Sequence, residues 1–212
     1  MNLFKVLRVL REIASKRDLG PTPAFGEIHI MEAIMLLGSE SPIGRLKLSK
    51  KLMLGESSAR TILKHLKTLG LVEASRRGYS LTRKGKRLYS FIRERILGPI
   101  EVEKNTLAFG DFNIAFLVKA AAEAVRLGLE QRDAAVRVGG LGAITLIFKD
   151  GRLVMPGVEG CTSEIVEVEK LVKSNFKLEE GDVVILGAGR SLREAELAAK
   201  AAVLETLRRL KG

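Results

Sequence analysis

Apolar residues recur at intervals of three and four along most of the N-terminal half of the chain, which is the spacing of amphipathic helices. Pro21 and Pro42 interrupt this pattern. Gly55 and Gly70 stand where two helices are expected to end, because glycine accepts the left-handed conformation of a helix C-cap. Between Gly70 and the next helix, two short extended runs joined by a turn predict a hairpin. The expected elements are helices at about 1–20, 25–40, 45–53, 57–69 and 82–97, and strands at 71–74 and 79–81.

Beyond Gly98-Pro99 the sequence becomes rich in Ala, Val, Gly and Leu, and expected strands and helices alternate. Asp150-Gly151, between two apolar runs, is the strongest two-residue signal for a β-hairpin. Over 114–127 periodicity fits either a strand to 118 followed by a helix at 119–127 or one continuous helix. The other expected elements are strands at 100–103, 143–148, 152–155 and 182–186, and helices at 132–138, 163–176 and 192–210. This order predicts an α+β fold whose C-terminal domain is a mixed α/β layer.

The basic residues are concentrated in the first half of the chain. In total 36 Lys and Arg stand against 25 Asp and Glu, a formal net charge of +11. Residues 1–98 hold 20 of the bases and 8 of the acids, whereas residues 99–212 hold 16 and 17. We therefore divide the chain into an N-terminal amphipathic helix at 1–20, a basic domain at 21–98 and a near-neutral domain at 99–212. Because Lys and Arg at phosphates release condensed counterions, the basic domain is expected to bind a polyanion.

Several features predict a cytoplasmic protein. Charges at Lys5, Arg8 and Arg11 interrupt the first apolar segment, so a signal peptide is not expected. No apolar run has the length needed to span a bilayer, and a single cysteine, Cys161, excludes an intramolecular disulfide. Gln occurs once and Trp never, while Lys, Arg and Glu are plentiful, a bias typical of thermophilic proteins. We expect no membrane partner.

The stretch SARTILKHLKTLGLVEASRRGYSLTRKGKRL carries the most specific pattern. A helix ends in Leu-Gly-Leu-Val, a hairpin follows, and a Leu-Thr-x-Lys-Gly-Lys segment opens the next helix. With its flanks, over about 70 residues, it resembles the winged-helix domains of MarR-like and metal-dependent repressors. The run GLEQRDAAVRVGGLGAITLIFKDGRLVMPG is similar to the second domain of an uncharacterised archaeal winged-helix family, which supplies no activity. The resemblance implies a DNA-binding transcriptional regulator, with its third helix in the major groove and its hairpin wing on the adjacent backbone or minor groove.

Helical geometry divides the predicted recognition helix at 57–69 into two faces. At 100° per residue its apolar residues fall on one side, which must face the core. The opposite side holds hydroxyls and cations but no acid: Ser57, Arg60, Thr61, Lys64 and Thr68, with Lys67 at the flank. Hydroxyls bind phosphates or bases and arginine forks onto guanine, so this side predicts a DNA-binding surface. An ordinary solvated face, normally of mixed sign, is the alternative.

More cations stand at the hairpin and directly after it. Arg76 and Arg77 occupy the predicted hairpin turn, where guanidiniums suit contact with the DNA backbone or minor groove. Simple turn chemistry is the alternative there. Lys84 and Lys86 lie where the next helix begins, an unfavourable place for cations beside the helix dipole, so a nearby phosphate would explain them.

No metal, cofactor or catalytic residue is predicted. Two isolated histidines, at 29 and 65, and one distant cysteine do not form the ligand cluster that metal-dependent repressors need. The segment 187–192 (GAGRSL) follows a strand and opens a helix, but it lacks the third glycine and the βαβ unit of dinucleotide sites. The helix N-terminus there predicts a site for a small anionic effector, with a glycine turn and a structural cap as the alternative. Its residues would be Gly187, Gly189, Arg190 and Ser191.

These patterns favour a regulator that binds double-stranded DNA as a homodimer and carries a C-terminal sensing or assembly domain. Dimerisation is expected through apolar residues of the N-terminal helix, unless these bury against the chain's own core. They are Leu3, Phe4, Val6, Leu7, Leu10 and Ile13. The alternative function is a small-molecule enzyme with the winged helix as an autoregulatory appendage, although the sequence contains no nucleophile elbow or Walker loop.

Overall fold

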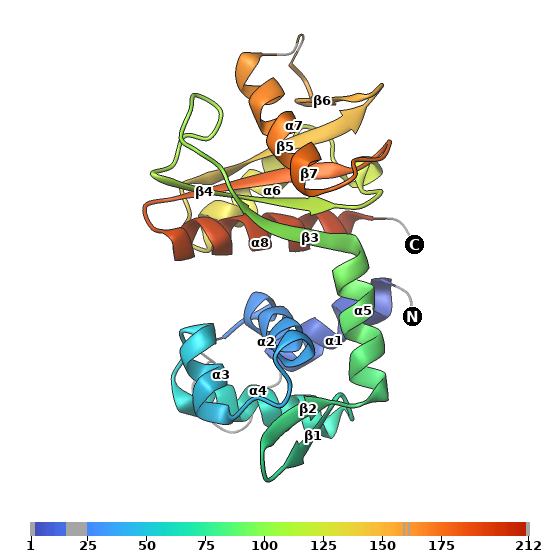
Figure 1. Cartoon of the computed structure of the whole chain (residues 1–212), viewed down its shortest axis with the longest axis vertical. Helices are drawn as coiled ribbons and strands as arrows, with labels where there is room; N and C mark the ends of the chain where they lie inside the picture. Colours follow the sequence, from blue (N-terminus) through green and yellow to red (C-terminus); the bar gives the residue numbers. More distant parts are fainter. Residues whose placement is uncertain (1–2, 16–24, 159, 161, 211–212) are drawn as a thin grey trace. The chain divides into compact units, whose positions relative to one another are not determined.

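The described residues of the basic half form helices with a β-hairpin at the edge of the unit (Figure 1). The computed structural model describes residues 3–15, 25–158, 160 and 162–210, and the chain separates into two units, 1–93 and 94–211. The first unit is built from α1 (Leu3–Ser15), α2 (Glu27–Ser39), α3 (Arg45–Leu52), α4 (Glu56–Thr68), β1 (Val72–Ser75), β2 (Gly78–Leu81) and α5 (Arg83–Arg95). The helices and the hairpin predicted from periodicity are therefore present, with ends within a few residues of those expected.

Helix α1 uses its apolar stripe inside its own unit. Val6, Leu10 and Ile13, spaced by four and three residues, are buried, and α1 packs on α2 and α4. The side chains of Leu3 and Phe4, and residues 16–20 of the expected helix, lie outside the described residues. Of the two roles expected for this helix, burial against the chain's own core is the one that the described side chains fulfil.

Two close backbone approaches fix the hairpin and α5. Ile43, between α2 and α3, exchanges both backbone hydrogen bonds with Tyr79 of β2 (3.0 and 2.9 Å) and so adds a short third strand to the hairpin. Gly38 of α2 lies so near the Tyr89 ring of α5 that a methyl group there would overlap it. The first contact anchors the hairpin to the α2–α3 connection, and the second packs α2 closely against α5.

Helix α3 ends differently from the expectation. Gly55 was expected to take the left-handed C-cap, but Met53 takes it instead, with φ 52°. Only three residues separate α3 from α4, and the last of them, Gly55, must be extended (φ −61°, ψ 151°) because it is the N-cap of α4. The left-handed residue therefore falls two positions earlier.

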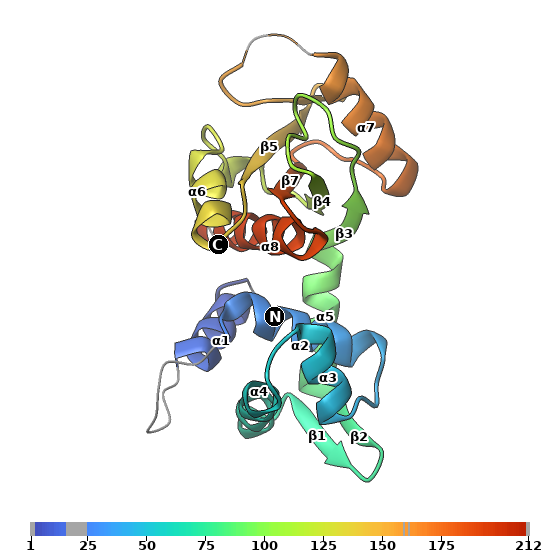
Figure 2. The same cartoon turned by 90° about the vertical axis from the view of Figure 1, so that its left-hand side faces the viewer.

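The second unit is a five-stranded sheet with helices on both faces (Figures 1 and 2). The strands lie in the order β3-β4-β7-β5-β6, and every neighbouring pair is antiparallel. The elements are β3 (Ile96–Glu101), β4 (Phe112–Val118), the 3₁₀ turn η1 (Ala122–Ala124), α6 (Leu129–Arg137), β5 (Gly142–Lys149), β6 (Arg152–Val154), α7 (Ser163–Asn175), β7 (Val183–Gly189) and α8 (Leu192–Arg209). The predicted α+β class is confirmed.

The expected mixed α/β layer is wrong for this unit, because the sheet is antiparallel throughout. Both helical crossovers, β4–α6–β5 and β6–α7–β7, do join strands that run in the same direction. In each case, however, one antiparallel strand is inserted between the two: β7 separates β4 from β5, and β5 separates β6 from β7. The alternation of strands and helices along the sequence is therefore compatible with two strands of one direction at each crossover, but it does not show which strand lies between them.

Side-chain alternation along the strands divides the core into two layers. Ala115 and Leu117 of β4, and Val184 and Leu186 of β7, share a buried cluster with Val168 and other apolar residues of α7. The intervening residues of the same strands face α8, which packs along β7 and β4, while α6 packs on α8 and β5. Because both faces of the central strands are covered, β4 and β7 are apolar at nearly every position.

The helix expected at 119–127 is absent, and so is the continuous helix over 114–127. After β4 the chain turns instead: Ala120 has φ 48°, and the N–H groups of Ala121 and Ala122 both donate to the Gly181 carbonyl (2.8 and 2.9 Å). The buried Asp182 accepts bonds from Ala120 N (2.9 Å) and Lys119 Nζ (2.6 Å). Burial lowers the pKa of Lys119, but its bonds to Asp182 and Glu179 raise it overall. These contacts replace the helix that local propensity favours.

The expected domain boundary at Gly98-Pro99 falls inside β3 rather than in a linker. Helix α5 ends at Arg95 and β3 begins at Ile96, while the division into units lies at Arg93. The ladder with β4 shifts register between Leu97 and Ile100. Gly and Pro thus mark a bulge in an edge strand, where a ladder tolerates the missing N–H of proline.

Candidate nucleic-acid interface

Helix α4 presents the two faces predicted for it. Its core side is buried through Ala59, Ile62, Leu63 and Leu66, and His65 is buried beside them. The opposite side is open to solvent, with Thr61 half-buried and the rest exposed: Ser57, Arg60, Lys64, Lys67 and Thr68. The helix therefore holds these six side chains on one surface because its apolar stripe fixes its rotation in the unit.

The cations of the first unit differ in whether an acid neutralises them. On α3, Arg45 pairs with Glu56 at 2.7 Å, and Lys47 pairs with Glu40 at 3.0 Å, as Lys51 also does. These bonds hold the pKa of Glu40 below its ordinary value, the bond from Lys51 contributing most. On α4, by contrast, Arg60 and Lys67 make no hydrogen bond or ion pair with any residue in the described part of the chain. These two side chains thus leave uncompensated positive charge on the outward face of α4.

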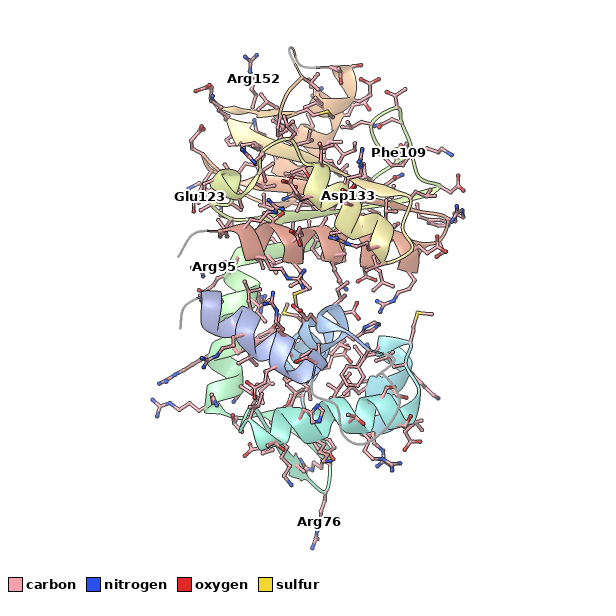
Figure 3. All side chains as sticks on the ribbon, turned by 180° about the vertical axis from the view of Figure 1, so that it is seen from behind. Arg76, Arg95, Phe109, Glu123, Asp133 and Arg152 are labelled. Atoms are coloured by element: carbon pink, nitrogen blue, oxygen red, sulfur yellow. The ribbon has the colours of Figure 1, made fainter. Side chains whose placement is uncertain are left out.

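The tip of the β1–β2 hairpin carries two more such cations. Ser75 Oγ donates to the Gly78 carbonyl (3.0 Å) and accepts from the N–H of Arg77 (3.2 Å), which closes the turn. Arg76 projects from that turn into solvent, as Figure 3 shows, and Arg77 is exposed beside it. Neither guanidinium is bonded to another described residue, so both remain available to an external anion.

The predicted residues at the start of α5 have separate roles. Lys84 Nζ donates to the Leu69 carbonyl at 2.6 Å, at the C-terminal end of α4. It therefore caps an orphan carbonyl of that helix, which explains a cation here without a phosphate. Lys86 is exposed and bonds to no other residue among those described. Thr82 begins α5 as expected, accepting from the N–H of Gly85 (3.2 Å).

The hydroxyl groups of the two threonines on the outward face donate their hydrogen bonds to backbone carbonyls of α4 itself. Thr61 Oγ1 donates to the Ser57 carbonyl and Thr68 Oγ1 to the Lys64 carbonyl, each at 3.0 Å. In this rotamer a threonine oxygen offers only lone pairs outward, and a phosphate needs a donor. The groups of α4 suited to phosphate are therefore the cations, with Ser57 in the first turn.

The predicted effector site at 187–191 has a different local structure from the turn expected. Gly187 and Gly189 are strand residues of β7, and a methyl group on either would overlap the backbone of α8. Ser191 is the N-cap of α8 and accepts from Glu194 N (3.2 Å), while the Glu194 carboxylate accepts from Arg190 N (2.9 Å). The glycines thus permit close packing, and the helix N-terminus already holds a carboxylate of its own. Ser191 and Glu194 therefore form the structural cap that is the alternative to an effector site here.

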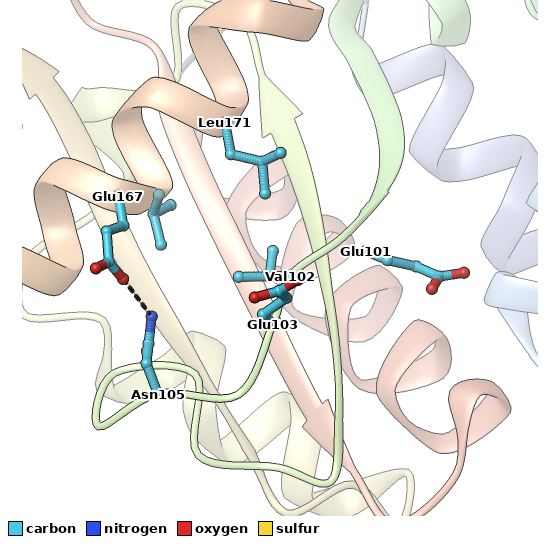
Figure 4. A pocket seen from close by; sticks show the side chains of 7 residues that line it. Glu101, Val102, Glu103, Asn105, Glu167 and Leu171 are labelled. Carbon is cyan, nitrogen blue, oxygen red and sulfur yellow. Dashed lines mark hydrogen bonds between the residues drawn. The ribbon is translucent and has the colours of Figure 1, made fainter.

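A cavity of about 350 Å³ lies elsewhere in the second unit, between α7 and the segment that follows β3 (Figure 4). Asn105 Nδ2 reaches Glu167 across it at 3.5 Å, and Glu101 is directed away from that pair. Its lining of three carboxylates and apolar side chains disfavours an anion: Glu101, Val102, Glu103, Asn105, Glu167, Val168 and Leu171. No local pattern in the sequence indicates this cavity, because its two walls are more than 60 residues apart in the chain.

Next to this cavity, the hydroxyl group of Thr106 lowers the pKa of the Glu164 carboxyl. Thr106 Oγ1 donates to Glu164 Oε1 at 2.6 Å, and Ser163 Oγ donates to the other oxygen at 3.1 Å. The Thr106 bond first, then the backbone N–H of Glu164 and its neighbouring hydroxyls, lower the pKa of Glu164 to about 2. The ionised carboxylate therefore ties the β3–β4 loop to the start of α7.

The described residues hold neither a membrane-spanning helix nor a cluster of metal ligands. No helix in 3–15, 25–158 or 162–210 is long and apolar enough to cross a membrane. Within the same ranges, no group of three or more His, Cys, Asp or Glu side chains is arranged to hold a metal ion. The basic surface of α4 and the hairpin is thus the candidate site in the described residues.

Two family models match the chain, one in each unit. Residues 29–87 match the PH0730-like N-terminal domain, and residues 109–207 match a domain of unknown function, DUF4443. The solved structure of the hypothetical protein PH0730 from the archaeon Pyrococcus horikoshii OT3 is similar, with a TM-score of 0.64 and 28% identity. That similarity covers 86% of this chain and 98% of that one, so it runs through both units. No protein with a curated description matches the chain.

Proposed function

We propose that the chain binds double-stranded DNA through α4 and the β1–β2 hairpin and regulates transcription. One observation carries the proposal: Arg60 and Lys67 of α4 and both arginines at the hairpin tip have no acidic partner among the described residues. Three cations of α3, by contrast, are paired with acids: Arg45, Lys47 and Lys51. An ordinary solvated surface interleaves both signs. Phosphates would supply the missing negative charge, with a gain in entropy from released counterions.

The arrangement of elements supports a winged-helix mode of binding. Helices α2, α3 and α4 precede the hairpin, and the bridge between Ile43 and Tyr79 anchors that hairpin to the α2–α3 connection. In this mode α4 enters the major groove, where Arg60 and Lys64 meet bases or phosphates. The hairpin is the wing, and Arg76 and Arg77 at its tip reach the neighbouring backbone or minor groove.

The second unit takes the role of sensing or assembly in this proposal, and the protein works in the cytoplasm as a homodimer. A small-molecule effector, if one binds, is expected at the cavity beside α7 rather than at the N-terminus of α8. The α7 cavity offers space and a carboxylate lining suited to a cationic group. The α8 terminus is occupied by its own Glu194.

The test is selection of bound duplexes from sheared genomic DNA with the full chain, followed by affinity measurements on a selected duplex. Replacing Arg60 and Lys67 together by Ala is expected to weaken binding roughly tenfold or more, since two phosphate contacts are lost. The matched control replaces Arg126 and Lys170, exposed cations of the second unit, and is expected to bind within about twofold of the wild type. Equal losses in both variants, or none in the first, would contradict the proposal.

A further inference from the structure

Apolar side chains from three separate segments are exposed together at one end of the sheet in the second unit. We call them the sheet-end patch: Phe109, Phe112, Val138 and Leu192, which are 39–46% exposed. Strands β4 and β5 start at this end and β7 finishes there, because Phe112 pairs with Gly189 and Gly142 with Ala188. The segment that follows α6 also reaches this end, because Gly140 lies against the Ala188 carbonyl, and α8 begins three residues after β7 finishes.

The loop that carries the two phenylalanines is held by side-chain amides. Asn113 is buried, donates through Nδ2 to the Gly110 carbonyl and accepts through Oδ1 from its N–H, both at 2.9 Å. Asn105 Oδ1 accepts from the N–H groups of Leu107 (3.0 Å) and Ala108 (2.6 Å). The backbone that carries the rings is therefore anchored, so a partner that covers them does not have to order the loop.

The rim of the sheet-end patch carries charges of both signs. Asp111 pairs with Lys104 at 2.7 Å, and Arg132 pairs with Asp133 at 3.0 Å. The stem of Arg132 and the ring of Phe109 both lie against Gly142, so this ion pair borders the apolar centre. Figure 3 shows Phe109 and Asp133 on the same side of the unit.

A surface of this kind is complementary to itself. In a two-fold contact the same residues face each other from both chains, so an apolar centre meets an apolar centre. Acids and bases around the rim then pair in both directions, whereas a polyanion or a strongly acidic partner would meet Asp111 and Asp133 as like charges. With aromatic side chains of about 200 Å² each, the exposed apolar part is on the order of 300 Å², suited to the core of an interface of about 800 Å² per chain.

We infer that the sheet-end patch is the interface between two copies of this chain. The inference rests in one respect on the proposed function, since a winged helix commonly reads two half-sites with two recognition helices. Helix α1 was the expected pairing element, but Val6, Leu10 and Ile13 are buried within their own unit. The sheet-end patch supplies exposed apolar side chains, which the described side chains of α1, those of residues 6–15, do not.

The test is sedimentation equilibrium of the full chain. The wild type is expected to have twice the 23.2 kDa mass of the chain, and Phe109→Asp with Phe112→Asp to weaken dimerisation about 100-fold. Leu127→Asp with Val158→Asp, two exposed apolar residues of other segments, is the matched control and is expected to stay dimeric. Thermal unfolding of each variant establishes that it is folded.

Cross-linking gives a second measurement that does not depend on an aspartate variant. With Cys161→Ser, a Val138→Cys chain is expected to be joined to its partner by a short bis-maleimide, and a Val166→Cys chain is not. A monomeric wild type at about 100 µM, or dimers that survive the double Asp substitution, would overturn the inference. If the interface is found but no DNA is bound, the proposed function fails while the inference stands.

Discussion

The salt dependence of DNA binding measures the uncompensated charge of α4 and the hairpin directly. Five cations of this surface are bonded to no other residue in the described part of the chain: Arg60, Lys67, Arg76, Arg77 and Lys86. Each one that reaches a phosphate contributes about −0.9 to the slope of log K against log salt concentration. Five contacts give a slope of about −4.5, so affinity falls about 500-fold per half-site between 50 and 200 mM salt.

Removing two of these cations changes the slope by a predictable amount. The double variant Arg60→Ala and Lys67→Ala keeps three contacts, a slope of about −2.7, and a loss of about 40-fold over the same salt range. The control Lys47→Ala with Lys51→Ala removes the same charge from α3, where both lysines pair with Glu40. That control is expected to keep a slope near −4.5.

Fluorescence anisotropy of a labelled duplex carrying one half-site, titrated at four salt concentrations, gives these slopes. A wild-type slope near zero would refute the assignment of this surface to DNA. A double variant with the wild-type slope would refute the role of α4 in particular, while leaving the hairpin untested by that pair.

Two further predictions concern the second unit. Gly187→Ala is expected to lower the free energy of unfolding by about 3 kcal/mol, because the added methyl meets the backbone of α8. Gly44→Ala, at φ −77° with open space around it, is expected to cost about 1 kcal/mol or less, because Gly44 is the N-cap of α3, where alanine is less favourable than glycine. Equal urea midpoints for the two variants would contradict this. The lowered pKa of Glu164 means that its ionised form stabilises the fold above pH 4.5 and that this contribution is lost as the pH falls towards 2. Wild-type urea midpoints should therefore drop more steeply over that range than those of Glu164→Gln, and parallel curves would exclude the effect.

The sequence predicted what is encoded within one element. The outward and core faces of α4 follow from periodicity alone, because the rotation of a helix is set by its own apolar stripe. The β5–β6 hairpin follows from Asp150 and Gly151, which take positive φ angles of 51° and 80° as that turn requires. The cations of the candidate site were predictable for the same reason, since they lie on one helix and one turn.

Features that depend on distant residues could not be predicted. Lys119 to Leu127 has good helix formers, yet the bonds to Gly181 and Asp182 override that propensity. The role of Lys84 depends on a carbonyl 15 residues away at the end of α4. The strand order, the cavity beside α7 and the sheet-end patch likewise combine segments whose proximity no local pattern encodes.

The position of β7 in the sheet has a consequence for how the protein is made. It lies between β4 and β5 but follows both in the chain, so each of those strands keeps an unpaired edge until residue 189 has left the ribosome. The first unit, by contrast, has all its own elements once residue 95 is available. During synthesis the basic unit is therefore able to fold first. The open edges of β4 and β5 in the second unit, by contrast, need chaperones or rapid synthesis of β7 to protect them from aggregation.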